Sequence, residues 1–221
     1  MNKKVSKSLA VILVLFLIVG CDNQSTDKWS SGEITREDES AKLSVSWDGS
    51  SYKNDHIGFE VTIPDEWMKA PISELNIDDQ FNDNQYDTYF EGSDDVTDSY
   101  PDVIKIMQAG SEKTDFIPDS IYLFVTPTVN DDVGAFMEYR RSLDEAQYAD
   151  LDTLFVSEIT SVDVGGKKTI SYGIELTFEG VTYYQIYFAY YANGYFVVFS
   201  PAFSESSDNE ANQILESVKI N

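Results

Sequence analysis

Two apolar runs joined by a tight turn decide the fold class: VTYYQIYFAYYA (residues 181–192) and YFVVFSPAF (residues 195–203), separated by Asn193-Gly194. An Asn-Gly pair between apolar runs predicts a type I′ hairpin, because both central residues of that turn need a positive φ. Such a turn pairs Ala192 with Tyr195 and places Phe188 opposite Phe199. Both faces of the hairpin are then apolar, so we expect it inside a sheet that is covered on both sides.

Further apolar runs predict strands on both flanks of the Asn-Gly turn. Gly165-Gly166 separates runs at 154–164 and 167–178, and Glu179-Gly180 leads into the hairpin. Nearer the N-terminus, Phe59, Val61 and Ile63 alternate with polar residues up to a proline, the pattern of a half-buried strand. Residues 103–107 and 121–125 are two more short apolar runs. Together these runs predict an antiparallel meander.

Two stretches with helical periodicity are expected to cover the sheet. In residues 132–147, Asp132 is a plausible N-cap, and an apolar stripe follows it at Phe136, Tyr139, Leu143 and Ala146. Near the C-terminus, Ser207 and Glu210 form the S-x-x-E pattern of a capping box. Apolar residues then recur at helical spacing at Ala211, Ile214, Leu215 and Val218. The expected fold is α+β, an antiparallel sheet meander with helices packed on its faces.

The N-terminus has the features of a secretion signal. Lys3, Lys4 and Lys7 precede an apolar run from Leu9 to Val19, which is too short to span a bilayer and has the usual length of a signal-peptide core. The run ends in LIVGC (residues 17–21), which resembles the lipobox of bacterial lipoproteins. That resemblance implies cleavage between Gly20 and Cys21 and a diacylglyceryl group, with palmitate or a similar acyl chain, on Cys21. Residues 1–20 are therefore predicted to be a lipoprotein signal peptide.

Composition narrows the classes of partner. Cys21 is the only cysteine, so no disulfide can form within the chain. Without residues 1–20 the chain keeps 12 basic and 39 acidic residues, a net charge of −27. That charge argues against nucleic acid as a partner and against a domain that lies flat on an anionic bilayer.

The segment after the lipid attachment point is predicted to be a spacer. Residues 21–50 are rich in Ser, Asp, Glu, Asn and Thr and hold few apolar side chains. A flexible chain of that length would hold the domain roughly 30 Å from the membrane. We expect the globular domain over 51–221.

The order of these elements resembles the PsbP-like fold, which includes bacterial lipoproteins of the DcrB type. The residues that carry the resemblance are GFEVTIPDEW (58–67), the strands around Asn193-Gly194, and ILESVK (214–219). The resemblance covers about residues 52–220. It implies an α/β/α sandwich with a binding or accessory role, and it brings no catalytic residue.

The residue types that usually carry catalysis are sparse. His56 is the only histidine, so a His-based triad or a transition-metal site is not expected. Gly165-Gly166 fits a hairpin better than a phosphate-binding loop. Pairs of carboxylates are too numerous to single one out. We therefore expect no catalytic residue, no cofactor and no dedicated metal site.

Seven of the 14 tyrosines lie between residues 172 and 195 and allow two interpretations. They could form an aromatic platform for a glycan or a peptide, because tyrosine combines apolar area with a hydroxyl. They could also be ordinary strand residues, which we favour. The seven are Tyr172, Tyr183, Tyr184, Tyr187, Tyr190, Tyr191 and Tyr195.

The segment 74–102 contains ten acids and no Lys or Arg. Carboxylate and amide oxygens suit a hard cation, but Asp78, Asp79, Asn82, Asp83 and Asn84 do not follow the EF-hand order. We expect a solvated acidic loop that attracts divalent cations weakly. The ten acids are Glu74, Asp78, Asp79, Asp83, Asp87, Glu91, Asp94, Asp95, Asp98 and Asp102.

Taken together, the sequence predicts a non-enzymatic module that is anchored through Cys21 to the cell membrane, on its extracytoplasmic side. Its partner would be an envelope protein or polymer. The alternative is a carboxylate-dependent hydrolase of cell-wall glycans. A pocket with two convergent carboxylates would favour the hydrolase, and a featureless convex surface would favour the accessory role.

Overall fold

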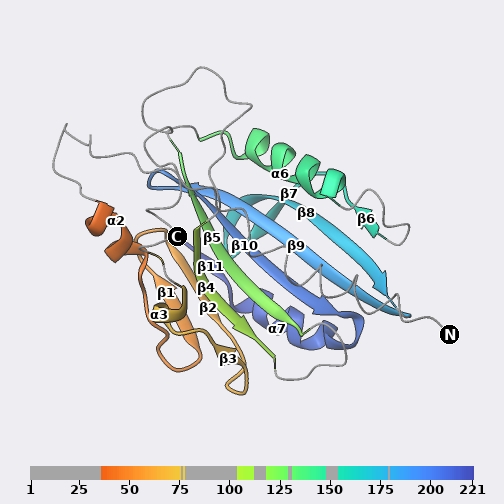
Figure 1. The fold of residues 1–221 in the computed structure, drawn as a ribbon, viewed down its shortest axis with the longest axis horizontal. Coiled ribbons are helices and arrows are strands. Elements are labelled where there is room, and N and C mark those ends of the chain that lie inside the picture. The colour runs from red at the N-terminus through yellow and green to blue at the C-terminus, as the bar shows by residue number, and fades with distance from the viewer. Residues whose placement is uncertain are drawn as a thin grey trace, which may run out of the picture. The chain divides into compact units, whose positions relative to one another are not determined.

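The computed structural model describes residues 36–75, 77, 104–111, 118–128, 131–147, 154–178 and 180–221. Two antiparallel sheets dominate this part of the chain (Figure 1). In the larger sheet the strand order is β3-β4-β5-β10-β9-β8-β6, and β7 also pairs with β8. Its strands are β3 (Met68–Lys69), β4 (Ile104–Gly110), β5 (Ser120–Pro127), β6 (Leu154–Val156), β7 (Thr160–Val164), β8 (Lys167–Phe178), β9 (Val181–Ala192) and β10 (Tyr195–Ser204).

The hairpin β9–β10 forms in the register that its turn predicts. Asn193 and Gly194 have φ of 49° and 85°, the two positive values that a type I′ turn requires. Ala192 pairs with Tyr195, and Phe188 pairs with Phe199. Each face of the hairpin belongs to its own apolar cluster, as expected from the alternation of side chains.

The larger sheet departs from a simple meander at β10. This strand lies between β9 and β5, so Phe199 pairs with Phe188 on one side and with Leu123 on the other. Because β10 pairs with β9 on one side and with β5 on the other, this most apolar strand has a neighbour along both of its hydrogen-bonding edges. The single strand expected at 154–164 is instead two strands, β6 and β7, which pair with successive parts of β8. Ser157 lies between them, and its hydroxyl accepts the Gly173 N–H at 2.8 Å.

Helix α6 (Val133–Gln147) covers one face of the larger sheet (Figure 1). Asp132 caps it as expected, since its Oδ1 accepts the Ala135 N–H at 3.0 Å. Phe136 stacks on Phe196 with ring centroids 4.5 Å apart.

The predicted apolar stripe of α6 is only partly right. Phe136 is buried, but Leu143 is 45% exposed and Ala146 is also exposed. Met137 and Asp144 are buried in their place. Helix α6 is therefore rotated from the position that its apolar residues favour, and a polar contact under the helix, described below, accounts for this rotation.

The opposite face is covered by a second, three-stranded sheet and by helix α7 (Asp208–Ser217) (Figure 1). This sheet has the order β1-β2-β11, with β1 (Ser51–Asn54), β2 (Phe59–Thr62) and β11 (Lys219–Ile220). Phe59 of β2 reaches Phe199 of β10 with ring centroids 5.2 Å apart. Ile214 and Val218 from the predicted helical stripe are buried in the same cluster. The α+β class with helices on both faces of an antiparallel sheet is thereby confirmed.

The domain begins earlier than expected. Helix α2 (Arg36–Leu43) lies within the segment that the sequence assigns to the spacer, and Leu43 is fully buried in the main core. The Asn54 amide contacts the carbonyls of Lys42 and Leu43, and Trp47 packs edge-on against Tyr52 at 5.4 Å. Contacts of a few apolar residues thus attach residues 36–50 to the domain, although most side chains in this segment are polar.

Candidate functional site

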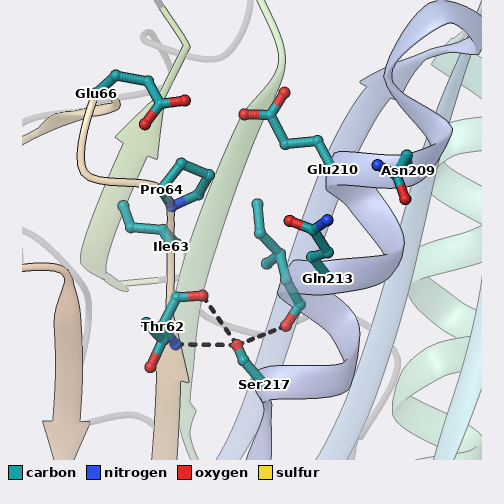
Figure 2. A pocket seen from close by; sticks show the side chains of 9 residues that line it. Thr62, Ile63, Pro64, Glu66, Asn209, Glu210, Gln213 and Ser217 are labelled. Carbon is teal, nitrogen blue, oxygen red and sulfur yellow. Dashed lines mark hydrogen bonds between the residues drawn. The ribbon is translucent and has the colours of Figure 1, made fainter.

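A groove of about 550 Å³ lies between the end of β2 and helix α7 (Figure 2). One wall is formed by the segment from Thr62 to Glu66 and the other by the inward side of α7. Of the residues that the structure describes, nine line it: Thr62, Ile63, Pro64, Glu66, Asn209, Glu210, Gln213, Ile214 and Ser217. The sequence pattern explains the first wall, because Pro64 ends β2 and turns the chain away from the sheet.

Hydrogen bonds between side chain and backbone hold the two walls together. The Ser217 hydroxyl accepts the Thr62 N–H at 3.0 Å and lies 2.9 Å from the Thr62 carbonyl oxygen and 2.7 Å from that of Ile214 (Figure 2). The ammonium of Lys69 donates to the carbonyls of Pro64, Asp65 and Trp67. Both backbone groups of Thr62 are engaged, so this part of β2 offers no free edge to an added strand.

Trp67 and Glu210 link the two walls near the start of α7. The buried Trp67 indole N–H donates to Glu210 Oε1 at 2.7 Å. Its ring packs on Phe203 of β10, with centroids 6.1 Å apart. The Glu210 carboxylate is therefore held by a residue 143 positions away in the chain.

The predicted capping box is wrong. Ser207 makes no side-chain cap to α7, and its φ and ψ of −106° and 13° are not the extended values of an N-cap. A turn of 3₁₀ helix, η1 (Glu205–Ser207), runs directly into α7. The Ser207 hydroxyl instead donates to Asp119 Oδ2, and the same carboxylate accepts the Ser204 N–H at 2.8 Å. Glu210 does not close a capping box and instead accepts the Trp67 indole N–H.

The groove brings together two carboxylates that the sequence analysis did not connect with each other. Glu66 and Glu210 extend toward each other from opposite walls (Figure 2). The amides of Asn209 and Gln213 add donors and acceptors, and Ile63, Pro64 and Ile214 supply apolar surface. The described part of the lining thus combines two carboxylates with neutral polar and apolar groups. In the sequence, Glu66 and Glu210 are two acidic residues among many, and no pattern indicates that they lie near each other.

Most of the clustered tyrosines are core residues, which confirms the interpretation that we favoured. Tyr172, Tyr187, Tyr190 and Tyr195 are each 2% exposed, and Tyr183 is also buried. Tyr184 is the most open of the seven, at 36%. The hydroxyl of Tyr190 donates to the Ile57 carbonyl at 3.0 Å, so this residue links the two sheets. The seven tyrosines do not form an aromatic platform.

A buried polar contact under α6 was not predicted. The Tyr172 hydroxyl donates to Asp144 Oδ2 at 2.5 Å, and the Tyr172 ring stacks on Tyr187 at 4.8 Å. The Arg140 guanidinium lies 6.0 Å from the Tyr187 ring centroid. Burial raises the pKa of the Asp144 carboxyl, although the Tyr172 hydrogen bond and the Arg140 charge act in the opposite direction. Burial and the neighbouring Asp144 raise the pKa of Tyr172. This contact orients α6.

His56 lies in the turn between β1 and β2. Its ring meets Tyr195 edge-on at 5.9 Å, and its backbone N–H donates to Asn54 Oδ1 at 3.0 Å. Within the described residues, no three His, Cys, Asp or Glu side chains are grouped so that they could hold a metal ion. In the same part of the chain, no helix is both long and apolar enough to cross a membrane.

Several predicted sites lie outside the described residues. These are the cleavage site at Gly20 and Cys21, the lipid attachment at Cys21, and the acidic segment 74–102 except Glu74, Leu75 and Ile77. Glu74 is exposed in the short helix α3 (Ile72–Leu75).

Comparisons with known proteins give similarity at the level of solved structures. No family model matches the chain, and no curated protein sequence matches it. LpqN of Mycobacterium tuberculosis, which is involved in cell envelope biogenesis, is similar with 13% identity and a TM-score of 0.43, over 74% of this chain and 83% of LpqN. The cyanobacterial PsbP protein (CyanoP) of Synechocystis is similar with 11% identity and a TM-score of 0.42, over 79% of this chain and 95% of CyanoP. A protein of Bacteroides thetaiotaomicron has 9% identity and a TM-score of 0.40, over 78% of this chain and 48% of its own.

A PsbP protein is thus among the structures that resemble this chain. At these identities and scores the likeness carries no inference about a ligand, a partner or an activity. Those must be argued from the residues of the chain itself.

Proposed function

We propose that the chain is a lipid-anchored module on the extracytoplasmic side of a bacterial cell membrane, where it binds an envelope component and performs no catalysis. The observation that carries this proposal is the N-terminal pattern of three lysines, an apolar run and LIVGC (residues 17–21). The small residue Gly20 directly before Cys21 is what lipoprotein processing requires. Two or more acyl chains would supply stable membrane attachment.

The groove between β2 and α7 is the binding surface that we assign to this module. Its walls are held together by the Ser217–Thr62 and Trp67–Glu210 hydrogen bonds. A site that is already ordered loses little conformational entropy when it binds.

The anchoring is tested by labelling cells with radioactive palmitate. The parent chain should take up label and be shortened by its signal peptide. Cys21→Ser should abolish the label and leave the full-length precursor, because the processing step depends on the lipid-modified thiol. Gly20→Ala is the matched control, since it keeps a small residue before the cysteine, and it should behave like the parent. Normal processing of Cys21→Ser, or an unlabelled parent, would contradict the proposal.

The facing pair Glu66 and Glu210 is the feature that favours the second candidate, a hydrolase of cell-wall glycans (Figure 2). Glycoside hydrolysis uses two carboxylates on opposite sides of the scissile bond. Release of reducing ends from purified cell wall should be compared for the parent chain and for Glu66→Gln combined with Glu210→Gln. Equal, background release supports the non-catalytic module. Release that the double substitution abolishes would establish the hydrolase.

A further inference from the structure

We propose that the larger sheet carries a second binding surface, formed by Phe155, Glu175 and Tyr184, which recognises an uncharged β-1,4-linked glycan of the envelope. The three residues belong to β6, β8 and β9, and none of them is among the described residues that line the groove between β2 and α7. This inference adds a ligand class to the proposed envelope-binding role and does not depend on the lipid anchor.

The pairing of three neighbouring strands places these side chains in one row. Phe155 pairs with Glu175, and Glu175 pairs with Tyr184. Directly paired residues of an antiparallel sheet point to the same face, and their neighbours along the chain point to the other face. The neighbours Val156 and Ile174 lie in the apolar cluster that α6 covers. The row therefore lies on the face of the sheet opposite α6.

The row is fixed at its inner end and open at its outer end. Its inner end continues to Phe203 of β10, which pairs with Tyr184 and is buried in the main core. At the outer end, Phe155 is 62% exposed, the largest value among the bulky apolar residues described, and Glu175 and Tyr184 are exposed as well. A single exposed apolar side chain is ordinary, but two aromatic side chains on either side of a carboxylate form a surface with a pattern.

The residues beside the row are small or carry hydroxyl groups. On one side Gly173, which has no side chain, pairs with the half-buried Ile186. On the other side Thr177 pairs with Thr182, and their hydroxyl oxygens lie 3.2 Å apart. These neighbours leave room for a ligand on the aromatic rings and offer it polar groups.

The spacing of the two aromatic residues suits a particular kind of glycan. Strand β8 separates β6 from β9, and neighbouring strands lie about 4.8 Å apart, so the backbones that carry the two rings are roughly 10 Å apart. In a β-1,4-linked glycan every second sugar presents the same face, and its repeat is close to this distance. The rings of Phe155 and Tyr184 can thus contact alternate sugars of one chain. The Glu175 carboxylate between them can accept hydrogen bonds from sugar hydroxyls.

Charge disfavours the other classes of partner. A protein would bury Glu175 in the middle of an apolar contact, whereas the cores of protein interfaces are depleted of charged residues. A second copy of the chain, an anionic polymer or an anionic membrane would be repelled, because the chain beyond residue 20 has 12 basic and 39 acidic residues. An uncharged glycan meets neither penalty.

The test is calorimetric titration of a chain that starts at residue 21 and carries Cys21→Ser, in a buffer without detergent. The probe is chitohexaose, a β-1,4-linked oligosaccharide of uncharged sugars. The control is maltohexaose, which has the same length and α-1,4 links that change the repeat. We expect chitohexaose to bind and maltohexaose to bind at least several-fold more weakly.

Substitutions locate the binding. Phe155→Ala and Tyr184→Ala each remove one ring and should each weaken chitohexaose binding about fivefold, the loss expected for one aromatic contact. Tyr184→Phe keeps the ring and should retain binding. Leu143→Ala is the matched control, because Leu143 is an exposed apolar residue of α6, which covers the opposite face, and this variant should bind like the parent.

Three results would each overturn the inference: absence of chitohexaose binding, equal binding of the two oligosaccharides, or unchanged binding in Phe155→Ala. Because Phe155 is largely exposed, Phe155→Ala gives the answer even if Tyr184→Ala destabilises the fold. Sedimentation of the parent provides a further check, since a dimer that Phe155→Ala dissociates would show that a second copy of the chain occupies this surface instead. The titrated chain carries no lipid, so a negative titration leaves the proposed anchoring to be decided by palmitate labelling alone.

Discussion

The C-terminal strand β11 should depend on one glycine of the β7–β8 hairpin. Gly165 has φ of +60°, and a Cβ added to it would lie 2.8 Å from Ile220 N, Lys219 Cα and Val218 O. The Ile220 N–H also donates to the Gly165 carbonyl at 3.2 Å. The neighbouring Gly166 has φ of +85° but has no atom within 4 Å of such a Cβ.

This difference between adjacent glycines gives a matched pair of substitutions. Gly166→Ala introduces only the backbone strain of a left-handed conformation, about 1–2 kcal/mol. Gly165→Ala adds to that strain the displacement of β11, which weakens one backbone hydrogen bond and the burial of Val218 and Ile220. We expect it to lower the free energy of unfolding by about 3–5 kcal/mol. That is a large part of the 5–15 kcal/mol that a typical domain has.

Both substitutions should be made in a chain that starts at residue 21 and carries Cys21→Ser, so that no lipid is attached. Urea unfolding followed by tryptophan fluorescence, extrapolated linearly to water, measures the two free energies. If Gly165→Ala costs no more than Gly166→Ala, then β11 does not pack on the hairpin as described and the reasoning is refuted.

Three further predictions concern the core, a buried carboxyl group and the acidic segment. Phe199→Ala and Phe188→Ala should each cost about 3–5 kcal/mol, with the larger loss at Phe199, which is 1% exposed and contacts the second sheet; melting within a degree or two of the parent would show that the hairpin register is wrong. Asp144→Asn keeps an oxygen acceptor for Tyr172 and removes a charge that the fold disfavours. Because burial raises the pKa of Asp144 in the folded chain, the parent loses stability as pH rises from the ordinary carboxyl pKa of about 4 through the raised value. Asp144→Asn should therefore raise the melting temperature at pH 7, and this gain should shrink near pH 4; a loss of stability at pH 7 would show that the Arg140 charge dominates. For the segment 74–102, Ca²⁺ and Mg²⁺ at about 1 mM should raise the melting temperature to a similar extent, with NaCl at higher concentration acting alike; saturation by micromolar Ca²⁺ with fixed stoichiometry would instead reveal a dedicated site.

Some features of this protein were determined by short stretches of sequence. The β9–β10 register follows from Asn193-Gly194, because a two-residue turn leaves one way to align its strands. The alternation at Phe59, Val61 and Ile63 likewise predicts the buried face of β2. The lipobox at residues 17–21 stays a prediction, because these residues lie outside the described part of the chain.

Other features were decided only by the tertiary structure. The predicted capping box does not form because the Ser207 hydroxyl donates to Asp119, 88 positions earlier in the chain. The buried face of α6 carries Asp144, which is hydrogen-bonded to Tyr172, and not Leu143. In the same way, Glu210 becomes a groove residue because Trp67 is folded against it. Local patterns report what a residue prefers among its neighbours in the chain. A polar side chain can instead take a partner that only folding brings close, because a buried donor or acceptor left without one costs about 1–3 kcal/mol.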